Sequence, residues 1–190
     1  MLIYTIETQY NKDNIKDFLF KNDTRHWFLS ENHAKKYVQE YSKKIPFAIF
    51  NAIEKEGWTI EITNKDIQKL YNIRYEIYGI TIEDEKKIYV CSHELAIQYA
   101  LAHEIGHFLD RYLGHISWTF RWKEIHSLHK KDVSVPEYYF TDESNNDEEY
   151  FAECFLLFIN DPILLKKINV SAYYLFEKLI NNIDAIVELI

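Results

Sequence analysis

The sequence is poor in the residues that cross-link a chain. It has only two cysteines, Cys91 and Cys154, which are too few for a disulfide framework. Each lies in an apolar stretch, which favours buried free thiols. No apolar run is long enough to span a bilayer. We also find no internal repeat and no low-complexity linker.

Long basic runs are absent as well. The chain has 22 basic and 30 acidic residues, a net charge of -8, and no basic cluster longer than Lys-Lys. Nucleic acids and anionic membranes favour a basic face, so we expect neither as a partner. The first residues lack the basic segment and apolar run of a signal peptide. As written, the sequence predicts a cytoplasmic protein, and a secreted protein whose leader has been removed is the alternative.

The patterns that are present predict a single α+β domain over residues 1–190, with 1–76 as an N-terminal part and 77–190 as the part that carries motifs. Alternating apolar residues predict strands over 2–8, 58–63, 78–82 and 87–91, the last two joined by a hairpin turn. Helical periodicity, with capping residues such as Ser30, Ser92 and Ser171, predicts helices over 30–44, 46–57, 66–70, 92–113, 117–131, 147–158, 162–168 and 171–190. A small sheet is therefore followed by a mostly helical C-terminal half, with a loop over 132–146.

One motif lies inside the long helix predicted over residues 92–113. Residues 103–107 read H-E-I-G-H. Positions four apart share one face of a helix, so the imidazoles of His103 and His107 can reach one small ion. The face around them is apolar, and burying two histidines and a carboxylate without a metal or other partner is costly. The motif predicts one Zn²⁺ per chain, with Glu104 as the general base acting on a metal-bound water.

Catalytic zinc sites use three protein ligands, so a third must be found. The metzincin spacing would require glycine and histidine where the chain has Asp110 and Leu113, which excludes that class. His115 follows the end of the predicted helix and would reach the ion only if the chain folded back. His126 and His129 lie on a charged helix, where we expect them to be solvated.

The helix predicted over residues 147–158 offers a better third ligand. Glu149 and Glu153 stand four apart on this strongly apolar helix, and a carboxylate there needs a partner. Two histidines with one glutamate form an established catalytic zinc set, so we predict Glu149 as the third ligand. Glu153 would hold a ligand imidazole by its free N–H. Asp110 is a second candidate for that supporting role, and its alternative is a surface carboxylate that pairs with Arg111 or a neighbour.

The two blocks together resemble a known family. H-E-I-G-H-F-L-D over residues 103–110 and E-Y-F-A-E-C-F over 149–155 resemble the lethal factor-type zinc metallopeptidases, which include the catalytic domain of anthrax lethal factor and the Pro-Pro endopeptidases. The resemblance covers roughly residues 77–190, and residues 1–76 contain no motif that aligns. It implies a zincin-like fold and the same ligands and base. We expect an edge strand, 87–91 or its hairpin partner, beside the active-site helix.

The resemblance also implies a tyrosine that stabilises the oxyanion and precedes the ligand glutamate. The family spacing falls on Asp142, so this sequence departs from the pattern. Tyr139 is the candidate for this oxyanion-stabilising residue, with Tyr138 as its alternative. The sequence is equally consistent with a tyrosine that only covers the core from a loop.

These patterns predict a zinc-dependent endopeptidase that hydrolyses a protein or peptide substrate. Three other interpretations stay open: an intracellular regulatory peptidase that cleaves a repressor, a secreted toxin or effector domain, and a zinc-binding module without turnover. Glu104 speaks against the last, because a structural site has no use for a general base. A fourth protein ligand such as His115 would favour it. The sequence defines neither the oligomeric state nor the cleavage specificity.

Overall fold

The computed structural model describes residues 19–21, 29–73, 77–130, 146–183 and 185. The chain divides into two units, Met1–Glu104 and Ile105–Ile190, and each is described by itself. The boundary falls within one long helix. The first unit contains a sheet and helices and the second is helical, so the predicted α+β class is confirmed. That residues 1–190 form one domain stays a prediction.

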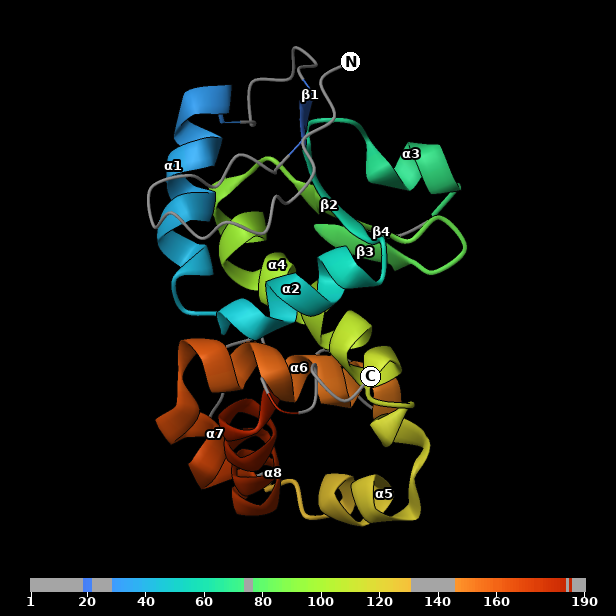
Figure 1. Ribbon diagram of the computed structural model, residues 1–190, viewed down its shortest axis with the longest axis vertical. Coiled ribbons are helices and arrows are strands. Elements are labelled where there is room, and N and C mark those ends of the chain that lie inside the picture. Colours follow the sequence, from blue (N-terminus) through green and yellow to red (C-terminus); the bar gives the residue numbers. More distant parts are fainter. Residues whose placement is uncertain (1–18, 22–28, 74–76, 131–145, 184, 186–190) are drawn as a thin grey trace. The chain divides into compact units, whose positions relative to one another are not determined.

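The first unit is built on a four-stranded sheet in the order β1-β2-β4-β3 (Figure 1). The strands are β1 (Leu19–Lys21), β2 (Thr59–Thr63), β3 (Gly79–Ile82) and β4 (Lys87–Cys91). β2 runs parallel to β1 and to β4, whereas β3 is antiparallel to β4. Three of the predicted strands are confirmed, and the strand predicted over 2–8 lies outside the described residues. β4 has neighbours on both sides, so its hairpin partner β3 is the outer strand.

The β3–β4 hairpin decides which side chains face the same way. Gly79 pairs with Val90 and Thr81 with Ile88, so Gly79 and Thr81 lie on one face of the sheet. The side chains of Val90 and Ile88 are fully buried on that face. The outer strand therefore presents a glycine and a threonine on the face where β4 buries its apolar residues.

Three shorter helices complete the first unit: α1 (Glu31–Ser42), α2 (Phe47–Lys55) and α3 (Ile67–Tyr71). Ser30 holds the N-cap position of α1 as predicted, but its hydroxyl contacts the ring of His33 and caps no backbone N–H. Asp66 caps α3 by accepting a hydrogen bond from the backbone N–H of Lys69. Gly57, with φ of 72°, lies just past the end of α2, a conformation that glycine adopts readily.

The long helix α4 spans Glu94–Tyr112. Its N-terminus differs from the prediction, because the residue before Glu94 is His93. The ring Nδ1 of His93 accepts a hydrogen bond from the N–H of Leu95 at 3.3 Å. Ser92 instead donates its backbone N–H to Thr63 at the end of β2. The helix ends as predicted near Gly114, whose φ is 81°.

Among its described residues, the second unit continues from α4 with a short 3-10 turn and four helices. They are η1 (Ile116–Trp118), α5 (Phe120–Ser127), α6 (Asp147–Asn160), α7 (Pro162–Ile168) and α8 (Val170–Asn181). The helix predicted over 117–131 is two elements, because Thr119 is extended and caps α5 through the N–H of Trp122. The predicted cap of the last helix is wrong: Asn169, not Ser171, accepts the N–H of Ala172.

Aromatic side chains form the core of the second unit. The ring of Trp122 lies 5.0 Å from that of Phe151 and 6.2 Å from that of Phe176, which ties α5, α6 and α8 together. Cys154 on α6 is also fully buried, and burial raises the pKa of its thiol well above the usual value. Cys91 is only half-buried, so the prediction of buried thiols is confirmed for Cys154 alone.

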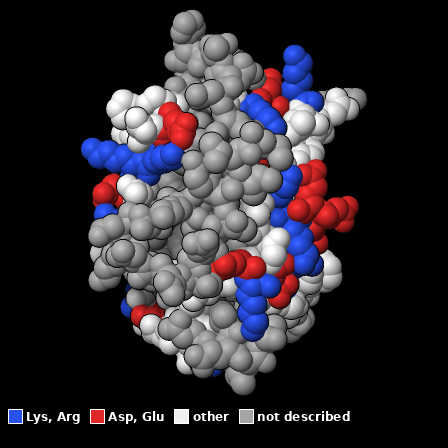
Figure 2. Space-filling view, turned by 45° about the horizontal axis from the view of Figure 1, so that its top comes forward, with Lys and Arg blue, Asp and Glu red and all other residues white. Residues whose placement is uncertain are grey.

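In the part of the chain that the structure describes, no helix is long and apolar enough to cross a membrane. Figure 2 shows acidic and basic side chains of the described residues next to one another on the face that it presents. Some of the charged side chains of the described residues form ion pairs, for example Lys87 with Glu85 at 3.5 Å and Lys35 with Glu31 at 2.6 Å.

Candidate metal centre

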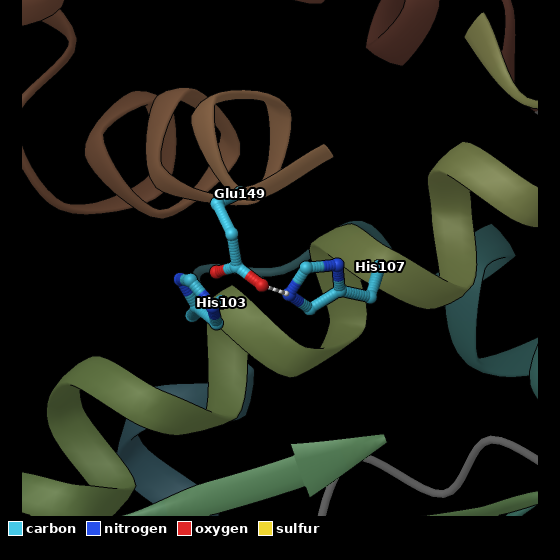
Figure 3. Close-up of side chains that lie close together, drawn as sticks. All are labelled: His103, His107 and Glu149. Atoms are coloured by element: carbon cyan, nitrogen blue, oxygen red, sulfur yellow. Dashed lines mark ion pairs between the residues drawn. The ribbon is translucent and has the colours of Figure 1, made fainter. Parts of the chain in front are cut away.

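Helix α4 carries both histidines of the predicted metal site. His103 and His107 are half-buried and stand four residues apart. Residues at this spacing project from one face of a helix. Figure 3 shows the two imidazoles on the same side of α4. The local geometry of the motif is therefore the one that its spacing predicts.

Glu149 reaches the same place from the first turn of α6. Asn146 begins this helix, because its side-chain oxygen accepts the backbone N–H of Glu148 at 2.9 Å. The Oε1 atom of Glu149 lies 3.5 Å from Nε2 of His107, and Figure 3 shows its carboxylate turned towards both histidines. One ligand atom from each of His103, His107 and Glu149 lies within 4.8 Å of the others. These residues are close enough to bind one metal ion.

The donor set is one that zinc accepts, and one pair of its atoms has a separation that suits zinc. Two imidazole nitrogens and one carboxylate oxygen are ligands that Zn²⁺ accepts, and bonds of about 2.0–2.1 Å in a tetrahedron place ligand atoms roughly 3.3 Å apart. The 3.5 Å between His107 and Glu149 is close to that value. About 21% of the His107 side chain and 31% of the Glu149 side chain remain exposed, which leaves room for water or substrate.

His115 is not a member of this group among the described residues. Its ring stacks on Trp118, with 4.0 Å between the ring centroids. A fourth protein ligand would close the site and favour a purely structural zinc centre. The arrangement of His115 gives that interpretation no support.

Gly106 explains how Glu149 can come so near His107. A Cβ atom at Gly106 would lie 2.8 Å from the Cα atom of Ala152 on α6, closer than real Cβ contacts allow. The backbones of α4 and α6 therefore approach each other where only a glycine fits. His107 follows Gly106 directly, and Glu149 lies one turn before Ala152. The close crossing thus places the two ligands opposite each other.

Side chains from η1 and α5 hold the first turn of α6. The indole N–H of Trp118 donates to the carboxylate of Glu148, and that of Trp122 donates to the backbone oxygen of Asp147 at 2.9 Å. His126 Nδ1 lies 2.7 Å from Asp147 Oδ1. The prediction of a solvated His126 is wrong, because α5 packs this ring against the start of α6. These contacts fix the turn from which Glu149 projects.

Glu104 is buried, and its carboxylate lies against the outer strand β3. Thr81 Oγ1 is 2.8 Å from Glu104 Oε2 and 3.1 Å from the backbone oxygen of Glu104. A Cβ atom at Gly79 would lie 2.8 Å from Glu104 Cγ and 2.9 Å from Oε1, so the side chain of Glu104 occupies the space that this glycine leaves. The predicted outer strand beside the HExxH helix is therefore β3.

Asp110 is buried near the end of α4. Its two carboxylate oxygens accept hydrogen bonds from the backbone N–H and the hydroxyl of Ser117, at 2.8 and 2.6 Å. Burial raises the pKa of Asp110, and the hydrogen bonds from Ser117 oppose that rise. Asp110 thus holds the turn between α4 and η1, and its alternative as a surface partner of Arg111 does not account for these contacts. A role beside the metal stays a prediction.

The remaining predicted site residues are placed less completely. Glu153 is buried on α6, one turn after Glu149, and its support of a ligand imidazole stays a prediction. Tyr138 and Tyr139 lie outside the described residues. Their role in stabilising an oxyanion therefore remains an expectation from the family resemblance.

Gly79, Thr81 and Gly106 are site residues that the sequence patterns did not single out. A glycine inside a helix costs about 1 kcal/mol relative to alanine, and this cost was the available signal for Gly106. A glycine in a strand marks close approach by another group, which was the signal for Gly79. Threonine is common in strands, so nothing set Thr81 apart.

The structure is similar to that of a Pro-Pro endopeptidase from Paenibacillus alvei, at 19% sequence identity and a TM-score of 0.63, over 85% of this chain and 96% of that chain. The two proteins share a fold. On that fold, His103 and His107 of α4 and Glu149 of α6 lie close enough to bind one metal ion.

No protein-family model matches the chain. No curated protein sequence matches it either.

Proposed function

We propose that this protein is a zinc-dependent endopeptidase. The observation that carries the proposal is the group of His103, His107 and Glu149, whose ligand atoms lie within 4.8 Å of one another. Glu104 directly follows the first of these residues, in the place of the general base. The fold shared with an endopeptidase and the sequence resemblance to the lethal factor-type metallopeptidases support the same conclusion.

Each residue has a distinct task in the proposed reaction. His103, His107 and Glu149 would hold the zinc, which when bound supplies a Lewis acid for polarising a carbonyl and acidifying water. Glu104 would accept the proton of the attacking water and pass it to the leaving amine. Tyr139, or Tyr138 in its place, would donate to the oxyanion of the tetrahedral intermediate. Glu153 and Asp110 would support the ligands from behind.

The substrate would be an extended peptide. The outer strand β3 pairs with β4 on one side only among the described residues, so its other edge can form backbone hydrogen bonds with an added strand. The similar solved structure is that of a Pro-Pro endopeptidase, which makes proline-containing peptides the first substrates to try. Cleavage of a diverse peptide library, with zinc and with a chelator, would define the specificity.

Two variants test the proposal through different steps. Glu104→Gln should retain zinc and lose hydrolysis by about two or more orders of magnitude, because it removes only the base. Glu149→Gln should lose most of the zinc, because a carboxylate ligand is replaced. Zinc content by elemental analysis and turnover of a cleaved library peptide check both. Full turnover by Glu104→Gln would contradict the mechanism, and full zinc occupancy in Glu149→Gln would remove Glu149 from the site.

A separate comparison concerns the oxyanion donor. The kcat values of Tyr139→Phe and Tyr138→Phe, measured in the same assay, identify which tyrosine has this role.

A further inference from the structure

The outer strand β3 contacts the side chain of Glu104 at two positions, Thr81 and Gly79. Thr81 Oγ1 lies 2.8 Å from Glu104 Oε2. A threonine hydroxyl has one hydrogen, and its two acceptors here are the carboxylate and, at 3.1 Å, the backbone oxygen of Glu104. The shorter distance and the negative charge favour donation to the carboxylate.

The second point of contact is the space above Gly79. Glu104 Cγ and Oε1 lie where the Cβ of any larger residue would be. Ala100, one turn earlier on α4, borders the same space at 3.1 Å. Gly79 and Thr81 alternate with Ile80 along the strand, so both face α4. The strand therefore receives one carboxylate oxygen above a glycine and binds the other with a hydroxyl.

A glutamate side chain otherwise has several rotamers, and ordering it costs conformational entropy. A carboxylate that is already held before substrate arrives does not meet this cost during the reaction. Any hydrogen-bond donor could satisfy the Glu104 carboxylate if burial were its only requirement. The contacts with Thr81 and Gly79 in addition fix the orientation of the Glu104 carboxylate.

We propose that Thr81 is the positioning residue of the general base, and that Gly79 leaves the space which its carboxylate needs. The inference rests on the proposed function, because it assigns Thr81 a task in the same reaction. The hydroxyl of Thr81 would hold the carboxylate through Oε2 while the proton is transferred. The edge that would bind substrate and the residue that orients the base are thus parts of one strand.

The main test compares Thr81→Val, which keeps the shape and loses the hydroxyl, with Thr81→Ser, which keeps the hydroxyl. We expect Thr81→Val to lower kcat by about 10- to 100-fold with KM and zinc content unchanged, since misplacement of a catalytic group has effects of this size. Thr81→Ser should restore most of kcat. Thr59→Val on β2 is the matched control and should behave like the wild type. Wild-type kcat in a zinc-loaded Thr81→Val variant would overturn the inference.

A second measurement does not depend on activity. In the zinc-free protein, urea unfolding of Thr81→Val, Glu104→Ala and the double variant forms a double-mutant cycle. We expect the double variant to lose less stability than the sum of the single variants, because each single variant already breaks the same contact. Additive losses in a protein whose wild type is active would refute this inference alone. Absence of hydrolysis by the zinc-loaded wild type, with a non-additive cycle, would refute the proposed function and leave the contact standing.

Discussion

At Gly79, an added Cβ atom would lie 2.8 Å from Cγ of Glu104. The atom that must yield belongs to a side chain with rotatable bonds, so the protein can relieve the clash by moving the carboxylate. We expect Gly79→Ala to change the melting temperature little and to lower kcat by at least about tenfold, because the base is displaced. Circular dichroism and peptide turnover measure the two effects. Unchanged turnover would show that the added methyl group does not displace the Glu104 carboxylate.

Other residues show that a polar side chain can hold an element as well as a reacting group. Asp110 accepts two hydrogen bonds from Ser117, and both serve the turn after α4. Asn169 caps α8 and also donates to the backbone oxygen of Ile125 and to the hydroxyl of Tyr150. Such residues tie one element to the next. Their hydrogen bonds stabilise the arrangement of the helices in the second unit.

At the scale of elements, the crossing of α4 and α6 decides whether the ligands can meet. A Cβ at Gly106 would lie 2.8 Å from the backbone Cα of Ala152, the same distance as at Gly79. Backbone cannot rotate away, so the helices would have to separate. We expect Gly106→Ala to lower the free energy of unfolding by about 1–3 kcal/mol and to weaken zinc binding, although alanine is the better helix former.

Gly79→Ala is the matched control for this prediction, because it adds the same methyl group at the same distance, 2.8 Å, from the nearest neighbouring atom. Urea unfolding in a chelator gives the stability, and zinc competition gives the affinity. A Gly106→Ala protein with wild-type stability and zinc affinity would show that α4 and α6 are less closely packed than the structure describes.

The local elements could be predicted because their signals lie within a few neighbouring residues. The spacing of His103 and His107 needs only helix geometry, and the β3–β4 hairpin needs only alternation and a turn. Glu149 could be predicted because a carboxylate in an apolar helix requires a partner. Each of these inferences uses a period or a cost that a short stretch of sequence carries.

The other features depend on packing between distant segments, which no local pattern carries. Thr81 and Glu104 meet only because β3 lies against α4. His126 was predicted to be solvated because its own helix is charged, yet Asp147 on α6 pairs with it. The helix predicted over 117–131 divides at Thr119, whose capping hydroxyl competes with helix continuation.

At the scale of the whole molecule, zinc should stabilise the folded chain, because the three ligands come together only on folding. Binding at free zinc about a thousand times Kd contributes about 4 kcal/mol. For a chain of this length that corresponds to an increase in melting temperature of roughly 8–16 °C. Thermal denaturation with zinc and with a chelator measures it.

Glu149→Gln should lose most of this increase. Glu148→Gln is its control: it changes the adjacent residue, which is outside the ligand group and still accepts from Trp118 through its amide oxygen. An equal zinc effect in both variants would place the stabilising ion somewhere other than this centre.

The burial of Cys154 has a practical consequence. Its thiol is fully enclosed on α6, five positions after Glu149 on the same helix, and its raised pKa leaves little thiolate to react. A thiol reagent can modify it at an appreciable rate only after α6 has opened. The rate at which this one sulfur is alkylated under native conditions therefore records how often the helix that carries the proposed third ligand leaves its place.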